Sequence, residues 1–256
     1  MTERPQVIFA ADGVRIDAGH FDGDRGRCVV LAHGFTGAWR QPTTRRIATL
    51  LSRYGGVLAI DFRGHGRSGG RSTVGDHEVL DIEAAVRQAR KLGYARVAVV
   101  GFSMGGCVAI RHAGLYGGVD AVVAVSAPAR WYYRGTTPMR QVHWVIERRS
   151  GRLIARLVKR TRIAAKGWDP VPAAPHEVVG EIAPTPLLIV HGDADHYLPL
   201  DHAEQLYAAA REPCELWIER GFGHAEAAAT PDLIKRIAGW LRSTDESEGA
   251  ETTIAG

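Results

Sequence analysis

The segment Val97–Gly106 carries a serine in a setting that could make it a nucleophile. An apolar run rich in valine ends at Gly101-Phe102-Ser103-Met104-Gly105, and a helix-like stretch follows as far as Tyr116. This is the pattern Gly-x-Ser-x-Gly at a strand-to-helix turn, where small neighbours relieve the crowding around a strained serine. The turn directs the hydroxyl outward, next to a helix N-terminus whose free N–H groups favour negative charge. A glycine-rich turn that only packs is the alternative.

A serine hydroxyl is a poor nucleophile at neutral pH and needs a base, for which histidine is suited by its pKa. The chain has eleven histidines. His224 ends the segment Gly221–His224, a glycine loop after the last expected strand that could direct the ring inward. His65 lies in a turn and His191 ends a strand, and both positions are more typical of structural histidines. We therefore expect His224 to be the base.

A carboxylate is needed to fix the tautomer of the imidazole and to stabilise its charged form. Asp195 follows the strand before the last, and Asp193 is its competitor, closer to the strand end. We favour Asp195 and expect Asp193 to hydrogen-bond the loop. The chain order Ser, Asp, His is the one expected for such a set on an α/β sheet. Asp61 also ends a strand, but its neighbour Arg63 suggests a structural ion pair.

Acyl transfer at Ser103 also requires two preorganised donors for the oxyanion. The backbone N–H of Met104, one residue after the serine, is the first candidate. The N–H of Phe35, which follows His33-Gly34 at the end of a strand, is the second. A simple turn after the strand is the alternative for His33-Gly34.

These clusters require a sheet that brings the ends of several strands together. The expected strands are 7–10, 14–21, 27–32, 56–60, 96–100, 120–126, 186–191 and 214–218, and the expected helices are 43–53, 76–92, 104–116, 200–211 and 231–242. Continuous apolar strands that alternate with helices predict a largely parallel sheet covered on both faces. In such sheets the chemistry lies at the carboxyl ends of the strands, which is where all the candidate residues fall.

Composition sets the broad class. The 256 residues are 45% hydrophobic and 23% charged, which suits one domain with an insertion. No apolar run approaches the roughly 18–20 residues of a membrane span, and no signal-peptide pattern is recognisable, so a cytoplasmic protein is expected.

Cys28, Cys107 and Cys214 are expected to be reduced core residues. We expect an α/β core over 1–128 and 181–242, a basic helical lid insertion over 129–180 and a disordered tail over 243–256.

Residues 130–166 concentrate positive charge. They hold eleven Lys or Arg and a single acid, Glu147, in a chain whose net charge is +4. Apolar residues recur among the arginines at helical spacing. The hypothesis is a lid whose apolar stripe roofs an acyl pocket and whose arginines attract an anionic or lipid-like substrate or a membrane surface. The alternative is a solvated basic face, since Arg outnumbers Lys throughout the chain. Nucleic-acid binding is not expected, because a single basic segment lacks a base-recognition motif.

Taken together, these segments resemble the α/β-hydrolase fold family, above all its serine esterase, monoacylglycerol-lipase and serine-aminopeptidase-like branch. The residues that carry the resemblance are His33-Gly34-Phe35, Asp61–Ser68, Gly101–Gly106, His191–Asp195 and Gly221–His224. The resemblance implies an eight-stranded, mostly parallel sheet with helices on both faces, a helical lid and a serine acyl-enzyme mechanism. A serine nucleophile argues against the dehalogenase, epoxide-hydrolase and dienelactone-hydrolase relatives.

The sequence therefore predicts a serine hydrolase that cleaves a carboxylic ester of a small-molecule acyl substrate and requires no metal or organic cofactor. Hydrolysis of a thioester, an amide or peptide, or a C–C bond, and acyl transfer, would use the same triad, and the fold does not choose among them. A ligand-binding protein that keeps the fold without turnover is the non-enzymatic alternative.

Overall fold

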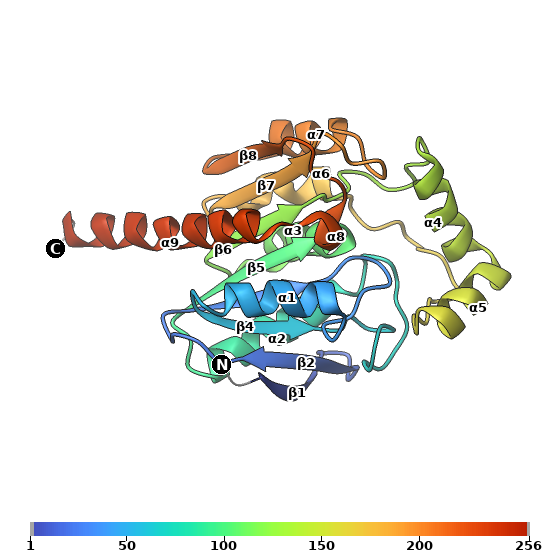
Figure 1. Cartoon of the computed structure of the whole chain (residues 1–256), viewed down its shortest axis with the longest axis horizontal. Helices are drawn as coiled ribbons and strands as arrows, with labels where there is room; N and C mark the ends of the chain where they lie inside the picture. The colour runs from blue at the N-terminus through green and yellow to red at the C-terminus, as the bar shows by residue number, and fades with distance from the viewer. Residues whose placement is uncertain (1–2, 255–256) are drawn as a thin grey trace.

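The computed structural model describes residues 3–254 and, from Glu3, the side chains as far as Thr244. Eight strands form one sheet in the order β1-β2-β4-β3-β5-β6-β7-β8 (Figure 1). The strands are β1 Glu3–Phe9, β2 Arg15–Phe21, β3 Arg27–Ala32, β4 Gly56–Ile60, β5 Arg96–Phe102, β6 Ala121–Val125, β7 Leu187–Gly192 and β8 Cys214–Glu219. The hairpin β1-β2 joins antiparallel to β4, and all pairs from β4 to β8 are parallel. The predicted eight-stranded, mostly parallel sheet is confirmed.

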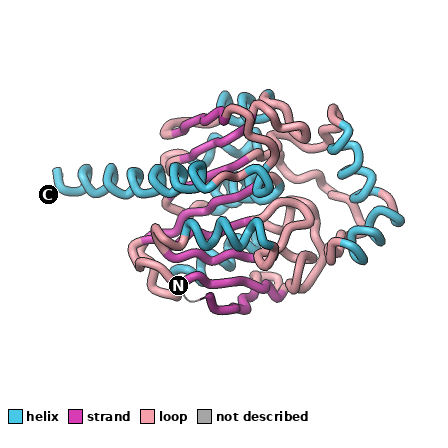
Figure 2. The backbone as a smooth tube through the Cα atoms, viewed as in Figure 1, coloured by secondary structure: helices cyan, strands magenta, loops and turns pink. Residues whose placement is uncertain are grey.

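Helices cover both faces of the sheet (Figure 2). They are α1 Pro42–Leu51, α2 Val79–Lys91, α3 Met104–Tyr116, α4 Thr137–Glu147, α5 Arg149–Val158, α6 Pro175–Val178, the 3₁₀ helix η1 Val179–Ile182, α7 Asp201–Ala209, α8 Ala225–Ala228 and α9 Pro231–Ile254. Apolar residues of α1, α8 and α9 pack on one face, and those of α2, α3, η1 and α7 pack on the other.

The central strand β5 shows why the core forms in two layers. Val97 and Val99 belong to the core on the α2-α3 face, whereas Ala98 and Val100 belong to the core on the α1-α9 face. All four are fully buried, because alternate side chains of a strand point to opposite faces and helices cover both. The sequence of β5 is therefore apolar at every position from Val97 to Val100 rather than at alternate ones.

The three cysteines behave as core residues. Cys28, Cys107 and Cys214 are buried and form no disulfide. Burial raises the pKa of the Cys28 and Cys214 thiols to about 12, so both stay protonated at neutral pH.

The structure differs from the sequence analysis at the C-terminal end. Disorder is expected from Ser243, but α9 continues as a helix to Ile254 and projects beyond the sheet (Figure 1). The segment 243–254 contains no proline. Adding residues to an existing helix avoids the cost of nucleation, so a polar composition alone does not end it.

The basic segment forms two helices that lie together at the carboxyl end of the sheet (Figure 1). No residue of α4 is buried, and in α5 only Gly151 and Ala155 are. Further along the predicted lid segment, Val178 and Val179 pack into the core beside α3. Within residues 3–254, no helix is both long enough and apolar enough to cross a membrane.

Candidate active site

The predicted nucleophile lies on a strained turn between β5 and α3. Ser103 precedes α3 and has φ 50° and ψ −116°, a conformation that L-residues rarely adopt. Two glycines allow it. A Cβ on Gly101 would lie 2.2 Å from the carbonyl oxygen of Gly105, and a Cβ on Gly105 would lie 2.3 Å from that of Ala32. Both clashes are with backbone, so β3, β5 and α3 approach this closely only because these residues are glycine.

The structure brings the three residues of the predicted triad together. Ser103 Oγ lies 2.9 Å from His224 Nε2, and His224 Nδ1 lies 2.7 Å from Asp195 Oδ2. A carboxylate only accepts hydrogen bonds, so the proton of the neutral ring lies on Nδ1 and donates to Asp195. The unprotonated Nε2 then accepts from the serine hydroxyl. These contacts join segments that are 121 and 29 residues apart in the chain.

Asp195, rather than Asp193, faces the histidine. The second oxygen of Asp195, Oδ1, accepts from the N–H groups of Tyr197 at 2.9 Å and Leu198 at 3.1 Å. Burial alone would raise the pKa of this carboxyl, but the hydrogen bonds from His224 and from the two amides hold it below its usual value. Asp193 instead accepts from the N–H of Gly221 and ties the two loops together, as the sequence analysis expects of it.

The ring of His224 is also held from the side. Tyr197 stacks on it at 4.5 Å between ring centroids, with 25° between the planes. Ala225, which follows the histidine, has a positive φ of 52° and donates its N–H to Ser126 Oγ at 3.2 Å. The imidazole is thereby fixed by packing as well as by its hydrogen bonds.

Phe35 and Met104, whose N–H groups are the predicted oxyanion donors, both line the cavity beside Ser103. Met104 is the first residue of α3, where N–H groups lack intrahelical partners. The Phe35 N–H shares a peptide plane with the carbonyl of Gly34, which accepts from His33 Nδ1 at 2.7 Å and from the Gly37 N–H at 2.9 Å. Since the C=O and N–H of a trans peptide point in opposite directions, anchoring this carbonyl also orients the Phe35 N–H.

His33 acts on that loop through its tautomer. Its Nε2 accepts from the N–H of Phe62 at 3.1 Å, which leaves the proton on Nδ1 for the carbonyl of Gly34. Complete burial lowers the pKa of His33 to about 4, so the ring is neutral at physiological pH.

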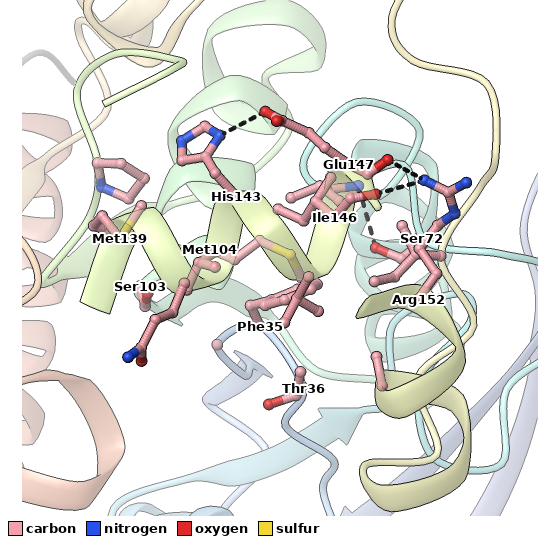
Figure 3. A pocket seen from close by; sticks show the side chains of 18 of the residues that line it. Phe35, Thr36, Ser72, Ser103, Met104, Met139, His143, Ile146, Glu147 and Arg152 are labelled. Atoms are coloured by element: carbon pink, nitrogen blue, oxygen red, sulfur yellow. Dashed lines mark hydrogen bonds and ion pairs between the residues drawn. The ribbon is translucent and has the colours of Figure 1, made fainter. Parts of the chain in front are cut away.

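A cavity of about 740 Å³ adjoins Ser103 and His224. Its roof is made by α4 and α5, and Figure 3 shows α4 with Met139 and Ile146 above Ser103, Phe35 and Met104. The apolar lid residues on the lining include Trp131, Met139, Val142, Val145, Ile146, Ile154, Val158, Ile163 and Trp168. A mostly apolar cavity of this size suits a substrate with an extended hydrocarbon part.

The sequence analysis misses one acid in this site. Glu226, two residues after His224, lines the cavity, and its Oε1 accepts from the N–H of Gly34 at 2.6 Å. The two residues are 192 positions apart, so sequence spacing gives no sign of the contact. The one available signal is an acid close behind the base in the same loop.

Comparisons with known proteins place the chain in a family. The model of a family described as the alpha/beta hydrolase family matches residues 29–234. The monoacylglycerol lipase of Mycolicibacterium smegmatis is 28% identical over 287 residues, covering 94% of this chain and 98% of that protein. The uncharacterised protein YqkD of Bacillus subtilis is 27% identical over 230 residues, covering 86% of this chain and 72% of that protein.

Solved structures show the same fold. The esterase Pf2001 of Pyrococcus furiosus superposes with a TM-score of 0.75 at 24% identity, covering 94% of this chain and 91% of that one. Est1E of Butyrivibrio proteoclasticus, solved with ferulic acid bound, superposes with a TM-score of 0.68 at 18% identity, covering 94% of this chain and all of that one.

Proposed function

Since the chain belongs to the alpha/beta hydrolase family, we propose that it is a serine hydrolase that cleaves a carboxylic ester through an acyl-enzyme intermediate. The observation that carries the proposal is the pair of hydrogen bonds made by His224, one with Ser103 Oγ at 2.9 Å and one with Asp195 at 2.7 Å. Both distances are those of hydrogen bonds in a working nucleophile–base–carboxylate set.

The reaction follows from these contacts. Ser103 Oγ attacks the ester carbonyl while its proton passes to His224 Nε2, and Asp195 stabilises the imidazolium that forms. The carbonyl oxygen gains the negative charge and takes hydrogen bonds from the Phe35 and Met104 N–H groups. Collapse of this intermediate breaks the C–O bond, and His224 gives its proton to the leaving alcohol. Water then attacks the acyl-serine with His224 again as the base, and the carboxylic acid leaves.

The lining of the large cavity favours an ester with an apolar acyl group. Hydrocarbon side chains of α4 and α5 face the space beside Ser103, and burying a methylene there gains about 0.8 kcal/mol. The similarity to a monoacylglycerol lipase over nearly the whole chain supports a lipid-like ester. Thioesters, amides, C–C bonds and acyl transfer use the same machinery, and they form the comparison set for the experiment.

The test is a panel of p-nitrophenyl esters of increasing acyl length, run beside the matching thioesters and anilides, with wild type and Ser103→Ala. We expect ester hydrolysis that depends on Ser103, with kcat/KM rising with chain length because each added methylene is buried. Hydrolysis that survives Ser103→Ala would refute the assignment to this site. Saturable binding of the esters by folded wild type without any product would favour the binding-protein alternative.

We further propose that α5 meets an anionic lipid surface, which would deliver such a substrate. Leu153 and Leu157 are 55% and 71% exposed and do not line the cavity, while Ile154 and Val158 do. The apolar arc of α5 thus continues from the outer surface to the rim of the cavity. The exposed Arg149 and Arg156 lie beside it, as expected of a helix that lies in the interface of an anionic bilayer.

Vesicle flotation tests this contact. Wild type should bind phosphatidylcholine vesicles that contain phosphatidylglycerol more than pure phosphatidylcholine vesicles, and the double variant Leu153→Ser/Leu157→Ser should lose that binding. Leu115→Ser is the matched control, since Leu115 is 51% exposed on α3 outside the lid. Equal binding of wild type and the lid variant would refute the contact.

A further inference from the structure

Glu226 places a carboxylate beside the reacting serine, with only Gly34 between them. A Cβ on Gly34 would lie 3.2 Å from Glu226 Oε2 and 3.3 Å from Ser103 Cβ. The mechanism proposed above gives this acid no role. An ionised carboxylate so close to the developing oxyanion opposes its formation, because two like charges repel strongly in a site with little water. A hydrogen-bond donor supplied by the substrate would offset this charge.

The two oxygens of this carboxyl are in different situations. Oε1 accepts from the N–H of Gly34. Oε2 lies 3.2 Å from the Cβ position of Gly34, the position that is itself 3.3 Å from Ser103 Cβ, and Glu226 lines the cavity beside the serine. Burial raises the pKa of Glu226, against the opposing effect of the Gly34 N–H. Hydrogen bonds to an ionised carboxylate are stronger than those between neutral groups, so a ligand that brings a donor is favoured beside this carboxyl.

A second, smaller cavity indicates which part of the substrate brings the donor. It measures about 190 Å³ and shares Gly34, Phe35, Thr36, Lys159 and Glu226 with the large cavity. Its lining also includes the polar side chains of Gln41 and Thr43. An ester whose hydrocarbon acyl chain occupies the large cavity can then place a polar alcohol portion in the small one.

The positive charge of the lid residue at this cavity does not cancel the preference of Glu226 for a hydrogen-bond donor. Lys159 also lines the small cavity, but it is exposed to solvent and no contact joins it to Glu226. Water screens an exposed ammonium far more than a carboxylate withdrawn behind the oxyanion loop. The donor preference of the cavity is therefore set by Glu226.

We propose that Glu226 is a specificity-determining residue whose Oε2 accepts a hydrogen bond from a hydroxyl or protonated amine in the alcohol portion of the ester. The proposal rests on the ester hydrolysis proposed above. It defines the substrate class more narrowly as an apolar acyl group joined to an alcohol that carries a hydrogen-bond donor. The donor binds Oε2 and offsets its charge next to the oxyanion, so the benefit appears in kcat/KM.

Two pairs of hexanoate esters with matched shapes test this. The 2-hydroxyethyl ester is compared with the propyl ester, and the 2-(dimethylammonio)ethyl ester with the 3-methylbutyl ester. We expect wild type to prefer the donor-bearing member of each pair by about 10- to 100-fold in kcat/KM, the usual range for a hydrogen bond to a charged group. The first pair reports a hydroxyl donor, and the second a cationic one.

Variants of Glu226 distinguish recognition of the substrate from structural support of the oxyanion loop. Glu226→Gln keeps an acceptor for the Gly34 N–H but removes the charge, and we expect the preference within the cationic pair to fall at least tenfold. Glu226→Ala removes both oxygens and should abolish the preference in both pairs. Glu204→Gln, at an exposed acid of α7, is the matched control and should leave both ratios unchanged.

Each other outcome has a definite meaning. Equal losses for all four esters in both Glu226 variants would show that the residue only holds the oxyanion loop and would overturn the proposal. Ser103-dependent hydrolysis of all four esters without preference in wild type would overturn it while leaving the proposed function intact. Failure of wild type to hydrolyse any of the four would overturn the proposed function and this inference together.

Discussion

Replacing Asp195 by asparagine should remove most of the catalytic power while leaving the fold in place. Asp195 Oδ2 lies 2.7 Å from His224 Nδ1, and the carboxylate side chain is fully buried. At that distance, an effective dielectric constant of about 20 gives roughly 6 kcal/mol between the carboxylate and the imidazolium that forms during attack. Loss of the equivalent charge in a well-studied triad lowers kcat about 10⁴-fold, which corresponds to about 5 kcal/mol. We therefore expect a loss of about 10³- to 10⁴-fold.

Asp193→Asn provides the matched control, because Asp193 lies on the same loop and its carboxylate accepts from the N–H of Gly221 rather than from the histidine. The assay is hydrolysis of a p-nitrophenyl ester, with the thermal midpoint of each variant measured in parallel. Asp193→Asn should stay within about threefold of wild type in kcat, since one loop hydrogen bond contributes about 1 kcal/mol to stability and none to the imidazolium. The reasoning fails if Asp195→Asn keeps more than a tenth of the activity, or if the two variants lose equal amounts.

Three further changes follow from the packing and the titrating groups. Gly105→Ala should lower the free energy of unfolding by about 3 kcal/mol, because its Cβ would lie 2.3 Å from a backbone oxygen. The control Gly239→Ala lies in α9, where a Cβ would meet nothing within 4 Å, and it should raise the free energy of unfolding by about 1 kcal/mol. Equal effects of the two substitutions in urea unfolding would contradict the structure. Since burial lowers the pKa of His33 from 6.5 to about 4, its contribution to stability is complete above pH 6.5 and is lost as the pH falls towards 4, by up to about 3 kcal/mol. Urea unfolding across this range should therefore show a shallower pH dependence in His33→Gln, and equal slopes would exclude the histidine as a cause. Phe62→Ala should lower stability by about 3–5 kcal/mol, since its ring is fully buried against His33, and a loss below 1 kcal/mol in the same assay would contradict that packing.

Much of the site could be predicted because its markers are local. The turn around Ser103 and the glycine loop before His224 can each be recognised from a segment of a few residues. The alternation of strands and helices then predicts that both lie at the same edge of the sheet. The choice between Asp195 and Asp193 depended on loop position alone, and the structure places Asp195 against the histidine.

What the sequence could not predict depends on contacts between distant segments. Asp61 and Arg63 are close in sequence and suggest an ion pair, but Arg63 pairs with Asp81 and Asp12, so that interpretation is wrong. The carboxylate of Asp61 instead accepts from two backbone N–H groups. The contact between Glu226 and the oxyanion loop was missed for the same reason, because it depends on how two loops at the end of the sheet meet.

The most direct test of the central claim is reaction with a fluorophosphonate probe, followed by mass spectrometry of the labelled peptide. The account predicts one label per chain on Ser103, none in Ser103→Ala, and labelling slowed by orders of magnitude in His224→Ala, because the serine needs its base. Folded wild-type protein that takes up no label, or that carries the label on another residue, would contradict an assembled nucleophile at Ser103.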